Sequence, residues 1–213
     1  QPALADADVA VVNLESASVL ISGGTRGIGR EIALRLAAEG ANITMLAKTR
    51  DPHPKLPGTL DSVATEIEAA GGNALPVAGD VRSEDDVDRA VALATMHFGG
   101  IDIVVNNASA IDLSHTVDLP MKKYDLMQDV NVRGAYMLSR AASPWLQRSA
   151  IAHILTLSPP LNLDPRWLGA HPAYTVSKYA MTVVTLGLAA ELAEVAVTAN
   201  CLWPRTTIAS IPH

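Results

Sequence analysis

The sequence predicts an α/β fold in which helices cover both faces of a doubly wound, parallel β-sheet. Short β-branched runs alternate with helical patterns along all 213 residues, an order that is typical of parallel strands joined by crossover helices. A glycine-rich loop directly after the first run and a Tyr-x-x-x-Lys sequence far downstream are the other two informative features. We expect residues 1–213 to form a single domain.

The first strand and helix are marked by a change of hydrophobic period. Residues 19–21 are typical of a buried strand, and Ile28, Ile32 and Leu36 then recur every four residues, which predicts a helix with one buried stripe. Gly40 follows where a left-handed C-terminal cap is favoured, so the helix should end there.

Five further strands complete a predicted sheet of six. They are short apolar runs at 43–46, 74–79, 101–105, 153–157 and 197–202. Between the second and third strands, residues 51–58 contain three prolines, which exclude a helix or a central strand. We expect a loop there.

A second helix start is marked by Ser83, which is followed by three acidic residues. A side-chain acceptor and negative charge are favoured at this position by the free N–H groups and by the helix dipole. Val87, Ala90, Val91 and Ala94 would then face the core.

Composition limits the classes of function. A net charge of −6 without basic clusters argues against a nucleic-acid partner. No apolar run approaches the roughly 20 residues of a membrane span, and the first residues lack the basic start of a secretory signal, so we expect a soluble, cytoplasmic protein. Cys201 is the single cysteine, which excludes an intramolecular disulfide, and the six histidines show no ligand spacing that indicates a metal site.

The glycine-rich loop follows the first strand and opens the first helix, where such a loop can hold a phosphate-bearing cofactor. A helix N-terminus offers N–H groups and partial positive charge to a pyrophosphate, and glycines let the backbone approach it closely. An ordinary strand-to-helix turn is the alternative. The candidate cofactor-binding residues of this loop are Gly23, Thr25, Arg26, Gly27, Ile28 and Gly29.

The end of the second strand indicates which dinucleotide the loop would hold. A carboxylate there would accept from a ribose hydroxyl and repel a 2′-phosphate, whereas this chain has Lys48. An ammonium about 4 Å from a phosphate gains roughly 1 kcal/mol per unit charge in water, and Arg26 and Arg50 could add to the same field. We therefore expect NADP(H) rather than NAD(H), with a solvated surface lysine as the alternative.

Further candidates for cofactor contact follow later strands. Asp80, with Val81 beside it, ends the third strand and could accept from an adenine amino group or be an exposed turn carboxylate. Asn107 and Ala108 close the fourth strand, where a side-chain amide and a small residue suit either the edge of a cofactor cleft or an Asx turn. Pro204, after the last strand, completes this group.

Tyr174 and Lys178 lie four residues apart on a helix predicted over about 173–193, and so share a face. A phenol is a poor base at neutral pH, but a neighbouring ammonium and an oxidised nicotinamide would both lower its pKa. Tyr174 could then take a proton from a hydroxyl, or give one to a carbonyl, as hydride passes to or from the ring. Lys178 would also hold the ribose; the alternative is a half-buried Tyr beside a snorkelling Lys.

These motifs resemble those of the short-chain dehydrogenase/reductase family: the glycine loop, the Asn-Asn-Ala segment at 106–108 and the Tyr174–Lys178 pair all correspond. The resemblance covers nearly the whole chain. It implies a Rossmann fold, an NAD(P)(H) cofactor, a small-molecule substrate and a homodimer or homotetramer. It also implies a catalytic set of Asn131, Ser158, Tyr174 and Lys178, in which Asn131 supports a proton relay through water to the lysine.

Two features depart from the family pattern. Pro159, which has no donor, stands where the family's substrate-polarising serine would be; either Ser158 reaches in from the neighbouring position, or Tyr174 alone polarises the carbonyl. The family also continues past Pro204 into a substrate-covering segment, whereas nine residues follow that proline here, so we expect this segment to be missing.

The residues together predict an NADP(H)-dependent oxidoreductase that acts on a hydroxyl/carbonyl pair. Its substrate would be apolar, and the resemblance points weakly to a steroid or a fatty-acyl chain. The alternative is a catalytically weakened NADP(H)-binding sensor or scaffold, which Pro159 and the short segment after Pro204 would favour.

Overall fold

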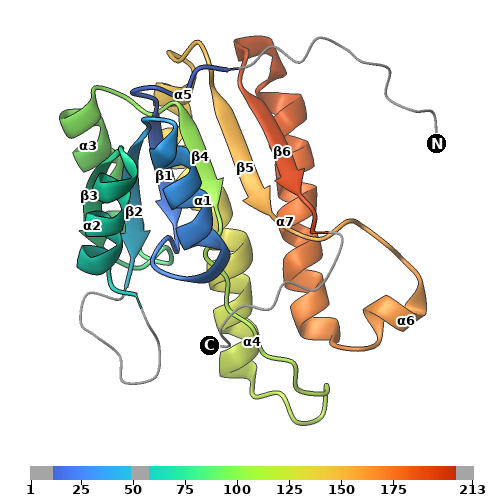
Figure 1. Ribbon diagram of the computed structural model, residues 1–213. Coiled ribbons are helices and arrows are strands. Elements are labelled where there is room, and N and C mark those ends of the chain that lie inside the picture. Colours follow the sequence, from blue (N-terminus) through green and yellow to red (C-terminus); the bar gives the residue numbers. More distant parts are fainter. Residues whose placement is uncertain (1–11, 49–57, 205–213) are drawn as a thin grey trace.

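The computed structural model describes residues 12–48 and 58–204 (Figure 1). Most of the proline-rich segment predicted to be a loop, together with Arg50 and all residues after Pro204, lies outside the described residues. Within them, a parallel sheet lies between two layers of helices.

Six parallel strands form the sheet in the spatial order β3-β2-β1-β4-β5-β6. Their bounds are β1 (Ser18–Ser22), β2 (Asn42–Ala47), β3 (Asn73–Ala78), β4 (Ile103–Asn106), β5 (His153–Leu157) and β6 (Thr198–Leu202). The first three strands extend the sheet in one direction from β1, and β4 pairs with the other side of β1 to extend it in the opposite direction. This is the predicted doubly wound, Rossmann-type order, and it puts a switch point at the carboxyl ends of β1 and β4, where such sheets bind ligands.

The fourth strand differs from its predicted bounds. The sequence favours a strand over 101–105, but β4 begins at Ile103, and Asp102 lies outside it. The Asp102 carboxylate accepts hydrogen bonds from the backbone N–H of Ser18 at 2.7 Å and from Ser149 Oγ at 2.6 Å. This side chain therefore joins the start of β1 to the turn before β5.

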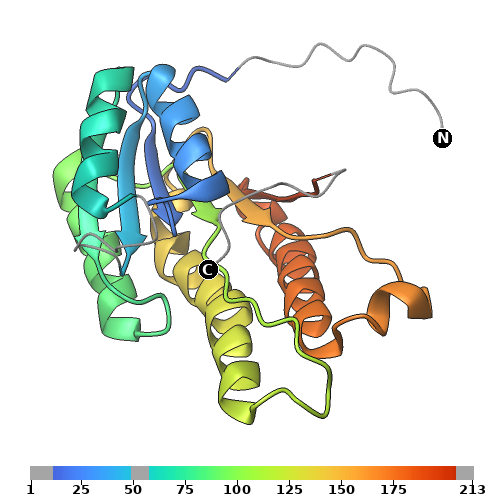
Figure 2. The same cartoon turned by 60° about the horizontal axis from the view of Figure 1, so that its bottom comes forward.

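Helices cover both faces of the sheet, as predicted. One face carries α1 (Gly27–Ala38) and α2 (Leu60–Ala70). The other carries α3 (Glu84–Phe98), α5 (Ala135–Leu146) and α7 (Pro172–Glu191), and the short elements are α4 (Met121–Met127), η1 (Gln128–Gly134), α6 (Pro165–Leu168) and η2 (Ala193–Val195). Figure 2 shows α7 beside the continuous helix made by α4, η1 and α5. Among the described residues, no helix is long and apolar enough to span a bilayer.

The first helix packs on the sheet through smaller residues than predicted. Ile28, Ile32 and Leu36, the predicted stripe, are only partly buried at the margin of the core. The residues of α1 that are fully buried each lie one position further along: Gly29, Ala33 and Ala37. Small side chains on the buried face allow the helix axis to approach the strands closely.

The local signals at helix ends are confirmed. Ser83 is the N-cap of α3, and its Oγ accepts from the Asp86 N–H at 3.3 Å. The predicted core positions of this helix are all buried: Val87, Ala90, Val91 and Ala94. Gly40, with φ +82°, follows α1 in the left-handed conformation expected of it.

The helix after α4 widens into a π-helical segment, η1. Such segments are rare and occur frequently at functional sites. Asn131 lies in the middle of η1 and is completely buried. At its end, a Cβ on Gly134 would lie 3.0 Å from Val81 Cγ2, so the loop after β3 packs directly against this glycine.

Gly29 lies where α1 meets the segment that follows β4. A Cβ at this position would overlap the carbonyl oxygen of Gly23 and the side-chain amide of Asn107, which are hydrogen-bonded to each other at 2.9 Å. Neither group can move without breaking that bond. We expect Gly29→Ala to lower the free energy of unfolding by about 1–3 kcal/mol, measured by urea denaturation.

Gly187→Ala in α7 is the matched control, because a Cβ added there has no heavy atom within 4 Å. The higher helix propensity of alanine should raise stability by about 0.5–1 kcal/mol at this position. If the two substitutions had the same effect, the close approach at Gly29 would not be a constraint on the fold.

Candidate active site

The carboxyl ends of β1 and β4 are tied together by hydrogen bonds. The Asn107 side-chain amide donates to the carbonyl oxygens of Ser22 at 3.2 Å and Gly23 at 2.9 Å. In return, Ser22 Oγ accepts from the backbone N–H groups of Asn107 at 3.2 Å and Ala108 at 3.1 Å. Asn107 thus contacts a segment distant in sequence, and does not form the Asx turn that was its alternative.

The glycine loop has a shape that side chains would fill. Gly23 (φ +72°) and Gly27 (φ +52°) adopt left-handed backbone conformations that favour glycine. A Cβ on Gly23 would also lie 3.0 Å from Ala108 Cα. The neighbouring Thr25 is buried and Ile28 is half-buried.

The start of α1 has no capping side chain of its own. Arg26 is the N-cap residue, its side chain makes no capping hydrogen bond, and the first turn of α1 contains no acidic residue. The backbone N–H groups and the positive end of the helix dipole lie beside the open backbone of the loop. This arrangement fits the pyrophosphate of a dinucleotide.

The ends of β2 and β3 carry a cluster of three charges. Asp80 Oδ2 lies 2.7 Å from Lys48 Nζ and 2.6 Å from Arg82 Nη2. Partial burial acts to raise the pKa of Asp80, but hydrogen bonds from Arg82 and Lys48 outweigh it and hold the pKa well below its usual value. Asp80 is therefore paired with two cations at the strand end, and its contact with an adenine amino group stays a prediction.

Val81 and Pro204, two further predicted cofactor contacts, lie in different environments. The Val81 side chain is buried in the core and packs against Gly134, so its backbone is the part that could face a nucleotide. Pro204 is exposed and directly follows β6 at the carboxyl edge of the sheet.

Tyr174 lies in the first turns of α7 and is half-buried. Burial raises the pKa of this phenol, and a side-chain hydrogen bond with Ser109 opposes that effect. Ser109 belongs to the segment that follows β4.

Lys178 extends toward the end of β5. Its Nζ donates to the Leu157 carbonyl oxygen at 2.7 Å and lies 3.3 Å from Met181 Sδ. Burial lowers the pKa of this amine to about 8, because the charged form is poorly solvated there.

Burial raises the pKa of the Tyr174 phenol. The expected lowering of this pKa by the Lys178 ammonium together with an oxidised nicotinamide stays a prediction. No hydrogen bond joins Tyr174 to Lys178 within the part of the chain that is described. The physical reason is that the amine is held at the Leu157 carbonyl oxygen.

The side chain of Asn131 joins two segments of the chain by hydrogen bonds. Its Oδ1 accepts from the Ala110 N–H at 2.6 Å, and its Nδ2 donates to the Ala110 carbonyl oxygen and to Ser177 Oγ, both at 2.9 Å. Ser177 Oγ in turn donates to the Tyr174 carbonyl oxygen at 2.8 Å. The side chain of Asn131 thus holds the backbone that surrounds Ser109 and Tyr174.

Ser158 is buried, and its side chain contacts α7. Ser158 Oγ accepts a hydrogen bond from Thr182 Oγ1 at 2.8 Å. Thr182 Oγ1 also lies 2.8 Å from the carbonyl oxygen of Pro159. These contacts favour the alternative in which Tyr174 alone polarises the substrate carbonyl and Ser158 does not reach it.

Sequence reasoning missed two hydroxyl groups of the site. Ser177 lies inside the Tyr174 to Lys178 interval, and its spacing of three from Tyr174 is the signal that could have shown its bond to that carbonyl. Ser109 is not among the candidate residues that the sequence singles out, and no local pattern connects it with Tyr174.

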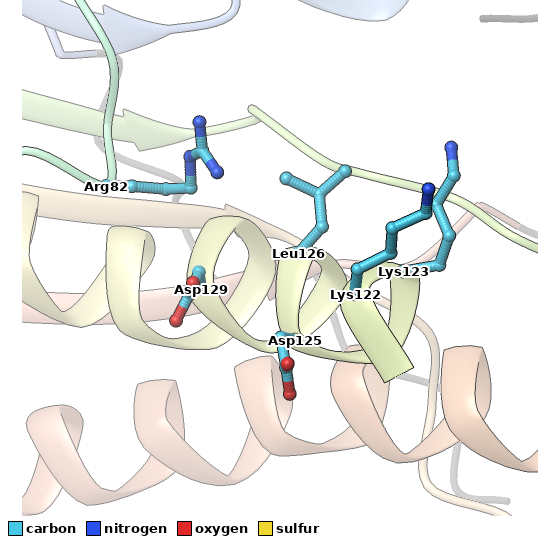
Figure 3. A pocket seen from close by; sticks show the side chains of 6 residues that line it. All are labelled: Arg82, Lys122, Lys123, Asp125, Leu126 and Asp129. Atoms are coloured by element: carbon cyan, nitrogen blue, oxygen red, sulfur yellow. The ribbon is translucent and has the colours of Figure 1, made fainter. Parts of the chain in front are cut away.

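Two hollows lie on the surface formed by the described residues. One, of about 380 Å³, is mainly apolar and is lined by Ser114, Thr116, Leu119, Met121, Tyr124, Pro172, Ala173 and Val176. The other, of about 400 Å³, is lined by Arg82, Lys122, Lys123, Asp125, Leu126 and Asp129. In Figure 3 the side chains of Lys122, Lys123 and Leu126 extend from the helix on the side where Arg82 lies. Among residues 12–48 and 58–204, no group of three or more His, Cys, Asp or Glu could hold a metal ion.

Comparison with known proteins identifies relatives of this chain. The family model described as short chain dehydrogenase matches residues 17–211. Hydroxysteroid dehydrogenase-like protein 2 of Bos taurus is 55% identical over 92% of this chain, and that of Homo sapiens is 54% identical over the same share. The chain spans about half the length of these curated relatives, namely 46%.

Solved structures show the same fold. A short chain dehydrogenase from Mycobacterium thermoresistibile is 51% identical with a TM-score of 0.90, covering 92% of this chain and 70% of that chain. A short chain dehydrogenase from Burkholderia cenocepacia J2315, solved in complex with NADP, is 30% identical with a TM-score of 0.78, covering 91% and 75%. The family model covers most of the sequence and the relatives share more than half of their aligned residues with it, so this chain belongs to the short-chain dehydrogenase family of oxidoreductases.

Proposed function

We propose that this protein is an NADP(H)-dependent oxidoreductase that transfers hydride between nicotinamide and a hydroxyl/carbonyl group of an apolar substrate. The observation that carries the proposal is the position of Tyr174: its carbonyl oxygen accepts from Ser177, which Asn131 joins to Ala110 in the segment that is tied to the glycine loop. A proton donor and a cofactor cradle thus lie at the same switch point.

The dinucleotide would lie along the carboxyl ends of the strands. Its pyrophosphate suits the glycine loop and the start of α1, Asn107 and Ala108 would border the nicotinamide half, and Lys178 would donate to the ribose. When bound, the nicotinamide supplies or accepts the hydride.

The protein's own contribution to the chemistry is a proton. In reduction, Tyr174 would give its phenolic proton to the substrate carbonyl oxygen, and in oxidation it would take the proton of the hydroxyl group. Lys178, with a pKa of about 8, is mainly an ammonium at neutral pH and can favour the phenolate while it stays protonated.

Lys48 supports NADP(H) over NAD(H). Together with Arg82 it places two cations around the single carboxylate of Asp80, which leaves net positive charge at the end of β2. The Lys48 side chain is 54% exposed, so its attraction for a 2′-phosphate lies toward the lower end of about 1–4 kcal/mol. The relative from Burkholderia cenocepacia that binds NADP is in line with this preference.

The apolar hollow beside α7 supports an apolar substrate. Leu119, Met121 and Val176 line it, and Ala173 and Val176 flank Tyr174 on its helix. A steroid or a fatty-acyl chain has the size and polarity that such a surface would accept. A homodimer or homotetramer is supported by exposed apolar side chains on α7, including Val183 and Leu186.

A catalytically weakened NADP(H)-binding sensor is the second candidate. It is favoured by the absence of a donor at Pro159 and by the engagement of the Ser158 hydroxyl with Thr182. Binding of NADPH without turnover of any member of a broad panel of ketones and alcohols would support this candidate against the enzyme.

Tyr174→Phe should lower kcat by about 10²–10⁴-fold, because it removes the proton donor. The affinity for NADPH should stay within about twofold of wild type, since the ring is retained. The matched control is Tyr179→Phe on the same helix, whose hydroxyl bonds to the backbone of Asn162. Steady-state turnover and fluorescence titration of NADPH measure both effects, and substantial turnover by Tyr174→Phe would overturn the proposed role.

Lys48→Asp should shift the cofactor preference toward NAD(H). The substitution replaces a cation with an anion beside Asp80, and about 1.4 kcal/mol of lost attraction already reduces the preference for NADPH tenfold. The ratio of kcat/KM for NADPH to that for NADH measures it. Lys122→Asp makes the same charge change on α4 and should leave the ratio unaltered; equal ratios in both variants would exclude the 2′-phosphate contact.

The affinity for NADPH should fall as the pH rises through about 8. The ammonium of Lys178 is the form that donates to the ribose, so affinity is constant below this pKa and decreases above it. Lys178→Met should bind NADPH more weakly and lack this inflection, while Lys178→Arg should keep the charge to higher pH. Titrations between pH 6.5 and 9.5, values chosen to bracket the pKa by about 1.5 units, measure it. An unchanged inflection in Lys178→Met would show that another group is responsible.

A further inference from the structure

The carboxylate of Asp80 is fixed in place after the end of β3. The Asp80 N–H donates to Asp86 Oδ2 at 2.9 Å, and the Asp80 carbonyl oxygen accepts from the Ser83 N–H at 2.9 Å. Arg82 holds the carboxylate itself: its backbone N–H and Nε donate to Oδ1 at 3.0 and 3.1 Å, and its Nη2 donates to Oδ2 at 2.6 Å. The backbone and the side chain of Asp80 therefore have little freedom to move.

The pairing of β2 with β3 brings Lys48 to this carboxylate. Ala47 and Ala78 are partners at the ends of the two strands, and the Gly79 N–H donates to the Ala47 carbonyl oxygen at 3.0 Å. Just beyond these residues, Lys48 Nζ lies 2.7 Å from Asp80 Oδ2. The ion pair thus follows from the strand register, and it lies at the carboxyl edge of the sheet, where a dinucleotide is expected to bind.

Lys48 is the partner in this pair that can move. Its side chain is 54% exposed, whereas that of Asp80 is 22% exposed. A lysine carries one compact charge on a flexible stem, while the planar fork of Arg82 is pre-organised on the carboxylate. An exposed ion pair of this kind is weak enough for another anion to displace it.

A 2′-phosphate at the end of β2 would compete with Asp80 for the same ammonium. The phosphate carries about two negative charges, so it attracts Lys48 more strongly than a carboxylate does, but Asp80 also repels it. A dinucleotide with a free 2′-hydroxyl has no such charge, and Lys48 then stays with Asp80. The carboxylate therefore acts against NADP(H) more than against NAD(H).

We propose that Asp80 is a specificity-determining residue, whose carboxylate competes with the 2′-phosphate for Lys48 and so moderates the preference for NADP(H). The inference rests on the proposed function, in which Lys48 contacts that phosphate. Lys48 has two positions: on Asp80 when NAD(H) or no dinucleotide is bound, and on the phosphate when NADP(H) is bound. Arg82 stays on Asp80 in both cases and limits the repulsion of the phosphate.

Asp80→Asn tests the competition, because it removes the charge and keeps an oxygen that can accept from the Arg82 N–H. The ratio of the dissociation constant of NADH to that of NADPH, from fluorescence titration, should rise about three- to tenfold. A contact of Asp80 with adenine would affect both constants alike and cancel in the ratio. An unchanged or lower ratio would overturn the proposal.

Asp85→Asn is the matched control. It makes the same change of charge at an exposed position in the first turn of α3. Because solvent and salt screen charges that are not in contact, the ratio should stay within about 1.5-fold of wild type. Asp80→Ser, whose hydroxyl can also accept from the Arg82 N–H, should give the same rise as Asp80→Asn and replaces it if that variant does not fold.

A double-mutant cycle shows whether Asp80 acts through Lys48. In a Lys48→Met background, Asp80→Asn should change the ratio by less than about twofold, because the ammonium for which the two anions compete is gone. A purely structural role of Asp80 would change both dissociation constants and leave their ratio as it was. An equal rise in both backgrounds would refute competition for the lysine.

The outcome for Asp80 can be distinguished from that of the proposed function. If Lys48→Asp shifts the cofactor preference but Asp80→Asn does not, the NADP(H) proposal stands and the competition fails. If Lys48→Asp leaves the preference unaltered, both fail. Because the test measures dissociation constants, it applies equally to an oxidoreductase and to a sensor that binds NADP(H) without turnover.

Discussion

The buried side-chain amide of Asn131 is the interaction on which the geometry of the site depends. Its three hydrogen bonds join the segment after β4 to the first turns of α7, with Ser177 as the intermediate. An amide that is completely buried loses its contacts with water, and these bonds must replace them. The two segments can therefore move apart only at the cost of exposed or unsatisfied polar groups, and the π-helical segment η1 is the element that carries the amide to this position.

The same segment after β4 also supports the glycine loop. Asn107 bonds to Ser22 and Gly23, and Asn131 holds Ala110 three residues further along, so a series of polar contacts runs from β1 to α7. This arrangement requires close backbone approach, and Gly23 and Gly29 provide it because neither has a Cβ. A cofactor loop and a proton donor that share one rigid connection keep their relative positions without rearrangement during a reaction.

The charged groups of the protein act in two different environments. Lys48, Asp80 and Arg82 lie at a partly exposed strand end, where solvent screens each interaction and the effect on nucleotide selection is moderate. Lys178 and Tyr174 are more deeply buried, and burial shifts both pKa values toward the neutral form. Burial is therefore what sets the direction of both pKa shifts, while the amine of Lys178 is held at the Leu157 carbonyl oxygen.

Hydrophobic period, turn chemistry and motif spacing are local, and they were enough to predict six strands, the glycine loop, the cap of α3 and the pair Tyr174 and Lys178, while the family resemblance added Asn131. Only the tertiary structure decided which residues meet. It buried Gly29, Ala33 and Ala37 instead of the larger neighbours, paired Lys48 with Asp80, turned Ser158 toward Thr182 and joined Asn131 to Ala110 and Ser177. These contacts join segments far apart in the chain, and their strength depends on burial and on packing distances, which no local pattern of residues contains.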